Sequence, residues 1–238
     1  MSEIVLDIGN SRAKGAFFSQ GDLIENIVLP QDLMAAIGPW IDRHHPERML
    51  VSSTADEHLD LQQWLPEYAE VQYLTIDTPL PIQNSYESDT LGQDRIANAV
   101  AGHLKNSAAS LVIDAGSCVT YDWTVDGTYL GGSISPGLRM RTQAMHHFTG
   151  RLPQVEGPFP DEVLASTTTD ALRSGAFHGL RLEIDGIIRL FRSRFPEGTV
   201  LITGGDALLL ADRLENDIFA DPLLTLRGLH AILTYHST

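Results

Sequence analysis

Two similar strand endings, one in each half of the chain, place the strongest constraint on what this sequence can fold into. Each is a short apolar run that stops at an aspartate and turns on D-x-G. They read EIVLDIGNS at Glu3–Ser11 and SLVIDAGSC at Ser110–Cys118. Short apolar runs bounded by turn residues are typical of buried strands. The recurrence predicts two similar halves rather than an array of short repeats, whose periods are about 20–50 residues.

The order of predicted elements is also the same in both halves, with a strand meander first and helices and further strands after it. In the first half we predict strands at Ile4–Asp7, Lys14–Phe18, Leu23–Leu29, Arg48–Ser53 and Val71–Ile76, and helices at Gln31–His44, Asp56–Tyr68 and Gly92–Lys105. In the second half we predict strands at Ser110–Asp114, Val119–Val125, Thr128–Ile134 and Val200–Thr203, and helices at Gly137–His147, Thr168–Phe195, Ala207–Leu214 and Gly228–Leu233.

The predicted fold class is therefore α/β, with two similar lobes, each a mixed sheet with flanking helices. We place the N-terminal lobe at residues 1–106 and the C-terminal lobe at 107–238. Similar lobes would bring their D-x-G turns face to face across a cleft, which is a common place for a small-molecule site.

Composition excludes several classes of protein. The 238 residues are 43% hydrophobic and 20% charged, as in ordinary globular chains. No apolar run approaches the roughly 20 residues of a membrane helix, and the start has no basic region typical of a signal peptide. Cys118 is the only cysteine, which fits a reducing compartment, so we expect a cytoplasmic protein. The net charge of -15 disfavours nucleic-acid binding, which needs a basic surface.

The first D-x-G turn has the chemistry of a phosphate site. Its amides and the short polar side chains after Gly9 can wrap a phosphate, and Lys14 can add a positive charge. Asp7 would meet phosphate only through Mg²⁺ or its water ligands. Taken alone, the first D-x-G turn is more typical of an ordinary hairpin turn; the occurrence of two such turns favours a ligand site.

Two further segments fit such a site. In VLITGGDA, Gly204 and Gly205 end a strand, where bare backbone can lie against a flat ligand, although a plain strand-to-helix turn is the alternative. In LGQDRIANA, Asp94 suits the first turn of a helix. Arg95 is unfavourable there, so it requires another reason, such as an anionic ligand.

In chain order these segments resemble the type III pantothenate kinases, a family of the actin-like, sugar-kinase and heat-shock ATPase superfamily. DIGNSRAK is similar to the first phosphate motif of the family, LGQDR with Tyr86 before it and Asn98 after it to its substrate motif, and DAGSCVT with GGSISPG to its second phosphate motif. FTGRLP, TTDALRSG, ITGGDA and PLLTLRGL follow in the family order. The family usually reads D-x-G-T-A in the second motif; here Ser117 keeps the hydroxyl.

The resemblance implies ribonuclease-H-like, actin-like lobes and ATP-dependent phosphorylation of pantothenate, the first step of coenzyme A synthesis. It makes Asp94 the catalytic base and Asp114 the ligand of a monovalent cation, K⁺ or NH₄⁺. The implied ATP-binding residues are Asp7, Ile8, Gly9, Asn10, Ser11, Arg12, Ala13, Lys14 and Ser117, with Mg²⁺ held by Asp7 through water. The implied substrate-binding residues are Tyr86, Gly92, Gln93, Asp94, Arg95 and Thr168, where Thr167 and Thr169 compete with Thr168.

The resemblance also implies a homodimer, and from the charge and the lack of long apolar runs we expect no nucleic-acid or membrane partner. Two alternatives remain at this point. One is another small-molecule kinase, or a phosphatase, of the same superfamily. The other is a nucleotide-binding regulatory protein, against which Asp94 and Arg95 argue, because a protein that only binds needs no base.

Overall fold

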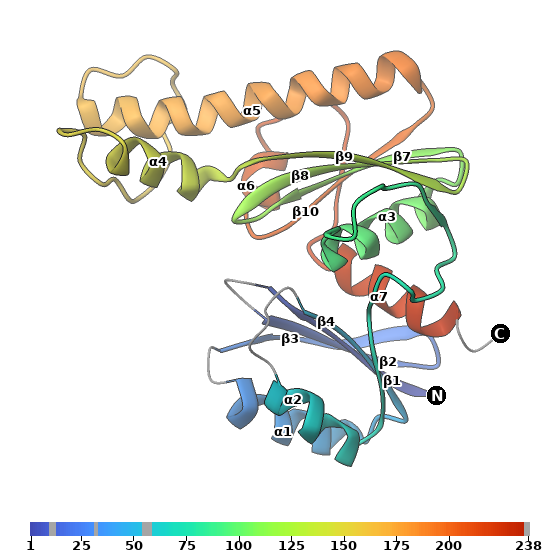
Figure 1. The fold of residues 1–238 in the computed structure, drawn as a ribbon. Coiled ribbons are helices and arrows are strands. Elements are labelled where there is room, and N and C mark those ends of the chain that lie inside the picture. The colour runs from blue at the N-terminus through green and yellow to red at the C-terminus, as the bar shows by residue number, and fades with distance from the viewer. Residues whose placement is uncertain (10–12, 31–32, 54–58, 236–238) are drawn as a thin grey trace. The chain divides into compact units, whose positions relative to one another are not determined.

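The computed structural model describes residues 1–9, 13–30, 33–53 and 59–235. The chain divides into two compact units (Figure 1). The first comprises Met1–Leu104, Gly127–Leu130 and Leu223–Thr238, and the second comprises Lys105–Asp126 and Gly131–Pro222. These units differ from the predicted lobes chiefly in the C-terminal segment, which packs with the first unit.

The sheet of the first unit has the order β3-β2-β1-β4-β5. Its strands are β1 (Ser2–Ile8), β2 (Ala13–Ser19), β3 (Asp22–Leu29), β4 (Arg48–Ser53) and β5 (Glu70–Tyr73). The first three form the predicted antiparallel meander. β4 then pairs parallel to β1, and β5 parallel to β4.

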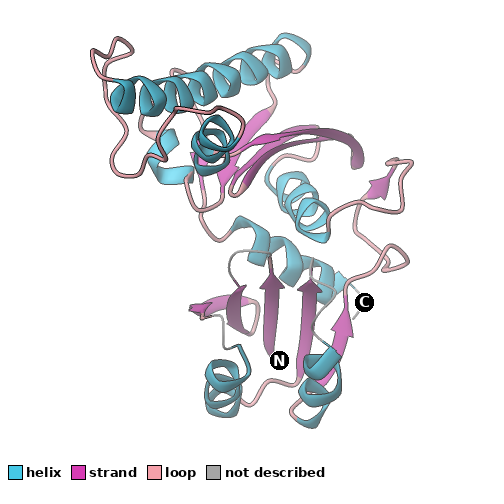
Figure 2. Cartoon of the chain, turned by 60° about the vertical axis from the view of Figure 1, so that its left-hand side comes forward, coloured by secondary structure: helices cyan, strands magenta, loops and turns pink. Residues whose placement is uncertain are grey.

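Helices cover both faces of this sheet, as the cyan and magenta elements of Figure 2 show. Val5 of β1 packs with α3 (Gln93–Lys105) and α7 (Leu224–Tyr235), whereas Ile4 and Leu6 pack with α1 (Leu33–His44) and the residues around α2 (Leu59–Trp64). A strand that is buried on both sides has no polar face, which explains the continuous apolar run of β1.

The C-terminal helix α7 is held against α3 by a close approach of the two backbones. A Cβ atom on Gly228 would lie 1.9 Å from the carbonyl oxygen of Ala97, so no side chain fits there. Beside this crossing, the Thr225 hydroxyl donates to Asn98 Oδ1 at 2.9 Å. Asn98 therefore serves the packing of α7.

A buried polar cluster ties the middle of α7 to β1. His230 Nε2 lies 2.8 Å from Glu3 Oε2, and the imidazole stacks on Phe18 with ring centroids 3.8 Å apart. Arg48 donates to the second oxygen of Glu3. Burial lowers the pKa of His230, although the Glu3 carboxylate acts in the opposite sense.

The second sheet has the order β11-β10-β7-β8-β9-β6. Its strands are β7 (Ala109–Ala115), β8 (Cys118–Val125), β9 (Thr128–Pro136), β10 (Thr199–Thr203), β11 (Phe219–Ala220) and β6 (Gln83–Asn84). β7 is antiparallel to β8 and parallel to β10, as β1 is to β2 and β4. Apart from the additional edge strand β6, the strand order of the second sheet corresponds to that of the first, which confirms the predicted similarity of the two halves.

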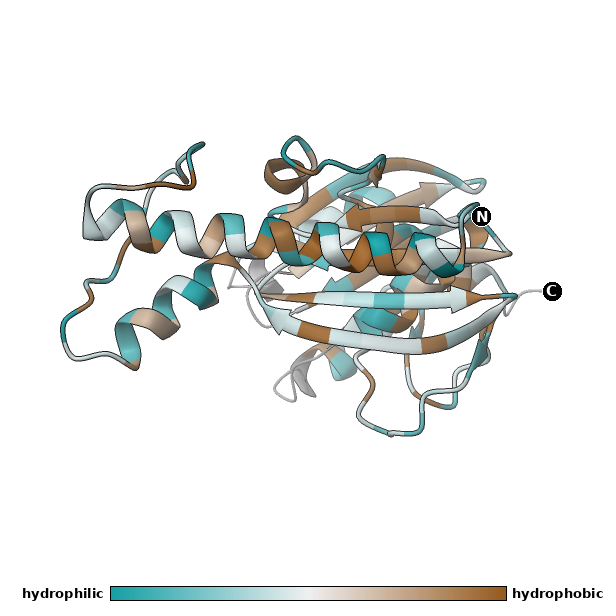
Figure 3. Ribbon diagram, turned by 90° about the horizontal axis from the view of Figure 1, so that it is seen from above, coloured by the Kyte–Doolittle hydropathy of each residue, from teal (hydrophilic) through white to brown (hydrophobic). Residues whose placement is uncertain are grey.

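The long helix α5 (Thr168–Arg194) packs its apolar stripe on one face of the second sheet, together with α6 (Ala207–Ala211). Seen from above, α5 carries alternating apolar and polar bands (Figure 3). Its N-terminal turns, with α4 (Leu138–His147), project beyond the sheet edge (Figure 1).

Several predicted elements differ in detail from the observed ones. The two-residue strands β6 and β11 were not predicted. The predicted strand at Val71–Ile76 ends early, at Tyr73. In the helix predicted at Gly92–Lys105, Ile96 and Val100 are buried, whereas Leu104, at the C-terminal end of α3, is 61% exposed. None of the helices in the described ranges is long and apolar enough to cross a bilayer.

Candidate active site

The first D-x-G turn begins at the end of β1. Asp7 is half-buried and stands opposite Lys14 on β2 and Ser52 on β4. The buried Ser52 hydroxyl donates to Asp7 Oδ1 at 3.4 Å. Ile8 and Ala13 are buried and Gly9 is half-buried, whereas the predicted phosphate ligands Asn10, Ser11 and Arg12 lie outside the described residues.

The start of α3 is fastened to the same edge of the first sheet. The amide of Ser53, at the end of β4, donates to Gln93 Oε1 at 2.9 Å. Carboxyl ends of parallel strands meet at one edge of a sheet, and β4 runs parallel to β1. Gln93 therefore brings the first turn of α3, with Asp94 in it, to the edge that carries Asp7.

Asp94 is half-buried and only partly engaged. Its Oδ1 accepts from the amide of Arg95 at 2.8 Å, which is a favourable use of a helix N-terminus. Its Oδ2 accepts no hydrogen bond from the residues that the structure describes. A Cβ atom on Gly92 would lie 2.5 Å from Asp94 Oδ1, so this carboxylate position requires glycine or a local shift.

Arg95 is a buried cation, only 5% exposed. Its guanidinium lies over the ring of Tyr86, 5.5 Å from the centroid, and Tyr86 is stacked with Tyr129. The loop before α3 is placed by Ser85, whose amide and hydroxyl both donate to the carbonyl of Tyr129. The unpredicted pairing of β6 with β9 thus sets the position of Tyr86.

The second D-x-G turn is clamped between two stretches of backbone. On one side the Gly137 amide donates to the Ser117 carbonyl at 3.1 Å, and on the other the Asp206 amide donates to the Ala115 carbonyl at 2.9 Å. Gly204 adopts a φ of +97°, and a Cβ atom there would lie 2.5 Å from Asp114 Oδ1. The Gly-Gly strand end of β10 therefore packs directly on the turn, and the Ser117 side of the turn stays exposed.

The two aspartates have similar but not identical neighbours. Each stands opposite a buried hydroxyl residue on the parallel strand, Ser52 for Asp7 and Thr203 for Asp114. On the antiparallel strand, Asp7 faces Lys14, whereas Asp114 faces the neutral Thr120. Directly opposed residues share a face of the sheet. The residue opposite Asp7 on the antiparallel strand is therefore a cation, and the residue opposite Asp114 is neutral.

These strand-end hydroxyls were not among the predicted site residues. Thr203 is the last residue of a predicted strand and Ser52 the second-last of another, and that position was the available signal. The parallel pairing that places them beside the aspartates is not visible in the sequence.

Thr168 is exposed at the start of α5. The preceding Thr167 is the N-cap residue, since its hydroxyl accepts from the amide of Asp170 at 3.1 Å and contacts Asp170 Oδ2 at 2.8 Å. Of the three competing threonines, Thr167 is therefore engaged in helix capping.

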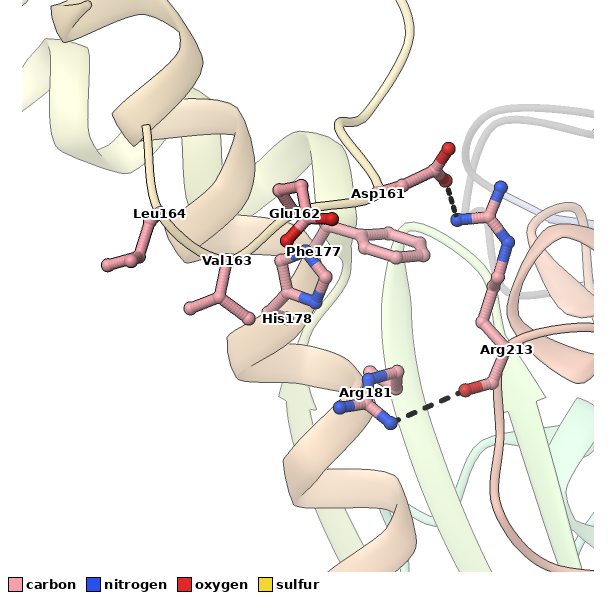
Figure 4. A pocket seen from close by; sticks show the side chains of 8 residues that line it. All are labelled: Asp161, Glu162, Val163, Leu164, Phe177, His178, Arg181 and Arg213. Carbon is pink, nitrogen blue, oxygen red and sulfur yellow. Dashed lines mark hydrogen bonds and ion pairs between the residues drawn. The ribbon is translucent and has the colours of Figure 1, made fainter. Parts of the chain in front are cut away.

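Two cavities lie in the second unit. One, of about 490 Å³, is lined by Asp161, Glu162, Val163, Leu164, Phe177, His178, Arg181 and Arg213, and contains none of the predicted site residues (Figure 4). The other, of about 370 Å³, is lined by residues that include Leu138 and Asp206. Leu138 follows Gly137, and both Gly137 and Asp206 bond the second D-x-G turn, so this smaller cavity adjoins the candidate site.

Comparison with solved structures defines the fold class. The chain resembles a conserved Campylobacter jejuni protein assigned to the Baf transcriptional activators, at 23% identity over 98% of each chain and a TM-score of 0.65. It also resembles the activator of 2-hydroxyisocaproyl-CoA dehydratase from Clostridium difficile, solved with bound ADPNP, at 10% identity over 100% of this chain and 96% of that one, with a TM-score of 0.53. These likenesses show an actin-like, two-lobed fold.

Sequence comparison then identifies the family. The model of the type III pantothenate kinase family matches residues 3–190. Type III pantothenate kinases of Bacteroides fragilis and Christiangramia forsetii are 38% and 35% identical to this chain, over 98% and 99% of both sequences respectively. The chain belongs to the type III pantothenate kinase family.

The capping arrangement makes a prediction about the neighbouring threonines. Replacing Thr167 with Ala should lower the free energy of unfolding by about 1 kcal/mol, because an N-cap hydroxyl is lost. Thr168→Ala is the matched control and should change it by less than about 0.5 kcal/mol. Urea unfolding of both variants measures the difference, and equal losses would contradict the assignment of the cap.

Proposed function

We propose that this protein transfers the γ-phosphoryl group of ATP to the primary hydroxyl of pantothenate. Membership in the family supports the activity, and one feature of the structure supports its chemistry most directly. One carboxylate oxygen of Asp94 is held by the amide of Arg95 at the helix N-terminus. The other oxygen stays available, and the side chain of Arg95 beside it is buried.

In the proposed reaction, the pantothenate hydroxyl oxygen bonds to the γ-phosphorus as the bond from that phosphorus to ADP breaks. The hydroxyl proton passes to Asp94 Oδ2. Phosphoryl transfer depends mainly on positioning and on neutralising charge. The main work of Asp94 is therefore to orient the hydroxyl, and a fixed carboxylate at the start of a helix suits that role.

Arg95 is the proposed ligand of the pantothenate carboxylate. Its guanidinium is desolvated and oriented by the Tyr86 ring, and guanidinium groups bind carboxylates in a fixed two-pronged geometry. Gly92 and Gln93 form the turn beside it. We further propose that Thr168 contacts the substrate, since Thr167 already caps the helix.

Two cations fit the two aspartates. When bound, Mg²⁺ near Asp7 and a monovalent cation at Asp114 supply positive charge that a chain of net charge -15 lacks. Both sites offer oxygen atoms, the donors that such cations prefer. Asp114, with a neutral threonine opposite, suits a resident monovalent cation better than Asp7, which has Lys14 opposite.

ATP would bind to the two D-x-G turns, with residues 7–14 and Ser117 near its phosphates. The exposed Ser117 and the backbone amides of these turns are suitable donors. The cavity beside Leu138 and Asp206, of about 370 Å³, is the proposed place of the nucleoside. The actin-like structure solved with ADPNP is consistent with nucleotide binding by this fold.

We also propose a cytoplasmic homodimer, as the family resemblance implies. ATP-dependent synthesis of a coenzyme A precursor belongs in the cytoplasm. Sedimentation of the purified chain should give about twice the monomer mass of 26.1 kDa; a monomer at working concentrations would contradict this part of the proposal.

The role of Asp94 predicts a large loss of turnover. Asp94→Asn should lower kcat by about 10²–10⁴-fold, the usual contribution of a positioned base. Binding of Mg²⁺-ATP should persist, because Asp94 is assigned to the acceptor and not to the nucleotide. Pantothenate-dependent ADP release measures turnover, and the exposed Asp77, changed to Asn, is the control. Near-normal turnover in Asp94→Asn would exclude the proposed role.

The role of Asp114 predicts a change in salt dependence. Wild-type activity should rise with K⁺ or NH₄⁺ and much less with Na⁺. In Asp114→Asn the half-activating K⁺ concentration should rise by about tenfold or more, because a formal charge at the cation site is lost. A titration of initial rate against each salt measures this, and identical K⁺ curves for both proteins would refute the cation site.

A further inference from the structure

Glu183 is an ionised side chain on the core-facing side of α5, where an apolar residue would ordinarily serve. Its neighbours Leu180 and Ile184 are fully buried in the core of the second unit. Its carboxylate is about one-third exposed and accepts from the Tyr121 hydroxyl at 2.8 Å and from Arg141 at 2.5 Å. Partly exposed ion pairs contribute little net stability, so stability alone does not explain this cluster.

The cluster is well satisfied electrostatically. Burial by itself would raise the pKa of Glu183. Hydrogen bonds from Arg141, Ser135 and Tyr121 nevertheless hold this pKa below its ordinary value. Burial and the hydrogen bond to Glu183 raise the pKa of Tyr121, which is 1% exposed and stays protonated. The cluster is therefore a fixed set of charge-assisted hydrogen bonds that joins β8, α4 and α5.

Arg141 connects these hydrogen bonds to the C-terminal end of β9. Its Nε donates to the carbonyl of Pro136 at 2.8 Å, and its NH2 group donates to the Ser135 hydroxyl at 2.8 Å. One guanidinium thus holds Glu183 and the last two residues of the strand at once. Its backbone amide also donates to the carbonyl of Gly137, at 3.0 Å.

The corner at Pro136 and Gly137 rests directly on the second D-x-G turn. The Gly137 amide donates to the Ser117 carbonyl, and a Cβ atom on Gly137 would lie 2.3 Å from the carbonyl oxygen of Gly116. Backbone lies on backbone here, with no flexible side chain between them to absorb a displacement. A shift of the corner must therefore move the turn.

We propose that Glu183 is a positioning residue for ATP: through Arg141 and the Pro136–Gly137 corner, it holds the Ser117 turn in the shape that receives the phosphates. This inference rests on the proposed role of Ser117 in binding ATP. The helix that bears Glu183 also begins with Thr168, so the same contacts join the proposed ATP turn to the helix of the proposed substrate threonine.

The test compares Glu183→Gln with the wild-type chain. Glutamine keeps the size of the side chain but removes the charge that holds Arg141. The Kd of Mg²⁺-ATP without pantothenate, measured by calorimetry, should rise by about tenfold, as should the KM for ATP. The KM for pantothenate should change by less than about twofold. Tyr121→Phe removes one donor and should shift both ATP constants less, in the same direction.

A matched control is available in the first unit. Glu25 likewise accepts from three side chains, Trp40, Arg43 and His44, and lies on β3 opposite Phe17, away from the first D-x-G turn. Glu25→Gln should lower the Tm without changing the ATP constants. Unchanged ATP constants in Glu183→Gln would overturn the proposal, as would equal proportional losses in both substrates and kcat.

Two outcomes separate this inference from the proposed function. A wild-type chain without pantothenate-dependent ADP release would defeat the proposed function, while the ATP Kd would still test Glu183. If Glu183→Gln fails to fold, Tyr121→Phe decides. A selective rise in its ATP Kd supports the positioning role, and an unchanged Kd refutes it.

Discussion

Parallel pairing of β4 with β1, and of β10 with β7, sets the surroundings of the aspartate in each D-x-G turn. β4 beside β1 sets Ser52 next to Asp7, and β10 beside β7 sets Thr203 next to Asp114. The end of β4 also supplies the Ser53 amide that holds Gln93 and, with it, the first turn of α3. If β4 paired elsewhere, Asp94 would not reach the edge that carries Asp7.

Charge is the second constraint, because a chain of net charge -15 must handle two anionic substrates. In the proposed function, a few cations at fixed positions bind these substrates. Lys14 stands opposite Asp7, and Arg95 is buried against an aromatic ring. Backbone amides of the glycine turns supply further positive potential without adding formal charge. The ion pair of Glu183 and Arg141 has a related role in the proposal, because it fixes the shape of the Ser117 turn.

Sequence patterns predicted the elements wherever local periodicity decided them. The meanders β1–β3 and β7–β9, the long helix α5 and the glycine strand ends lie where they were predicted. The misses have a common cause in distant contacts. β6 and β11 are too short to show a period and exist only because another strand pairs with them. The predicted lobe boundary likewise could not show that α7 packs on the first sheet through Gly228 and His230.

The sequence by itself determined that two apolar strands end in D-x-G turns, that Asp94 and Arg95 begin a helix, and which family the chain belongs to. These are properties of short segments and of their order. Only the tertiary structure decided that Asp7 and Asp114 differ in the residue opposite, that Thr167 rather than Thr168 caps α5, and that Glu183 bears on the Ser117 turn. Those relations join residues far apart in the chain or depend on hydrogen-bond geometry. The identities of the residues alone specify neither the distant contacts nor that geometry.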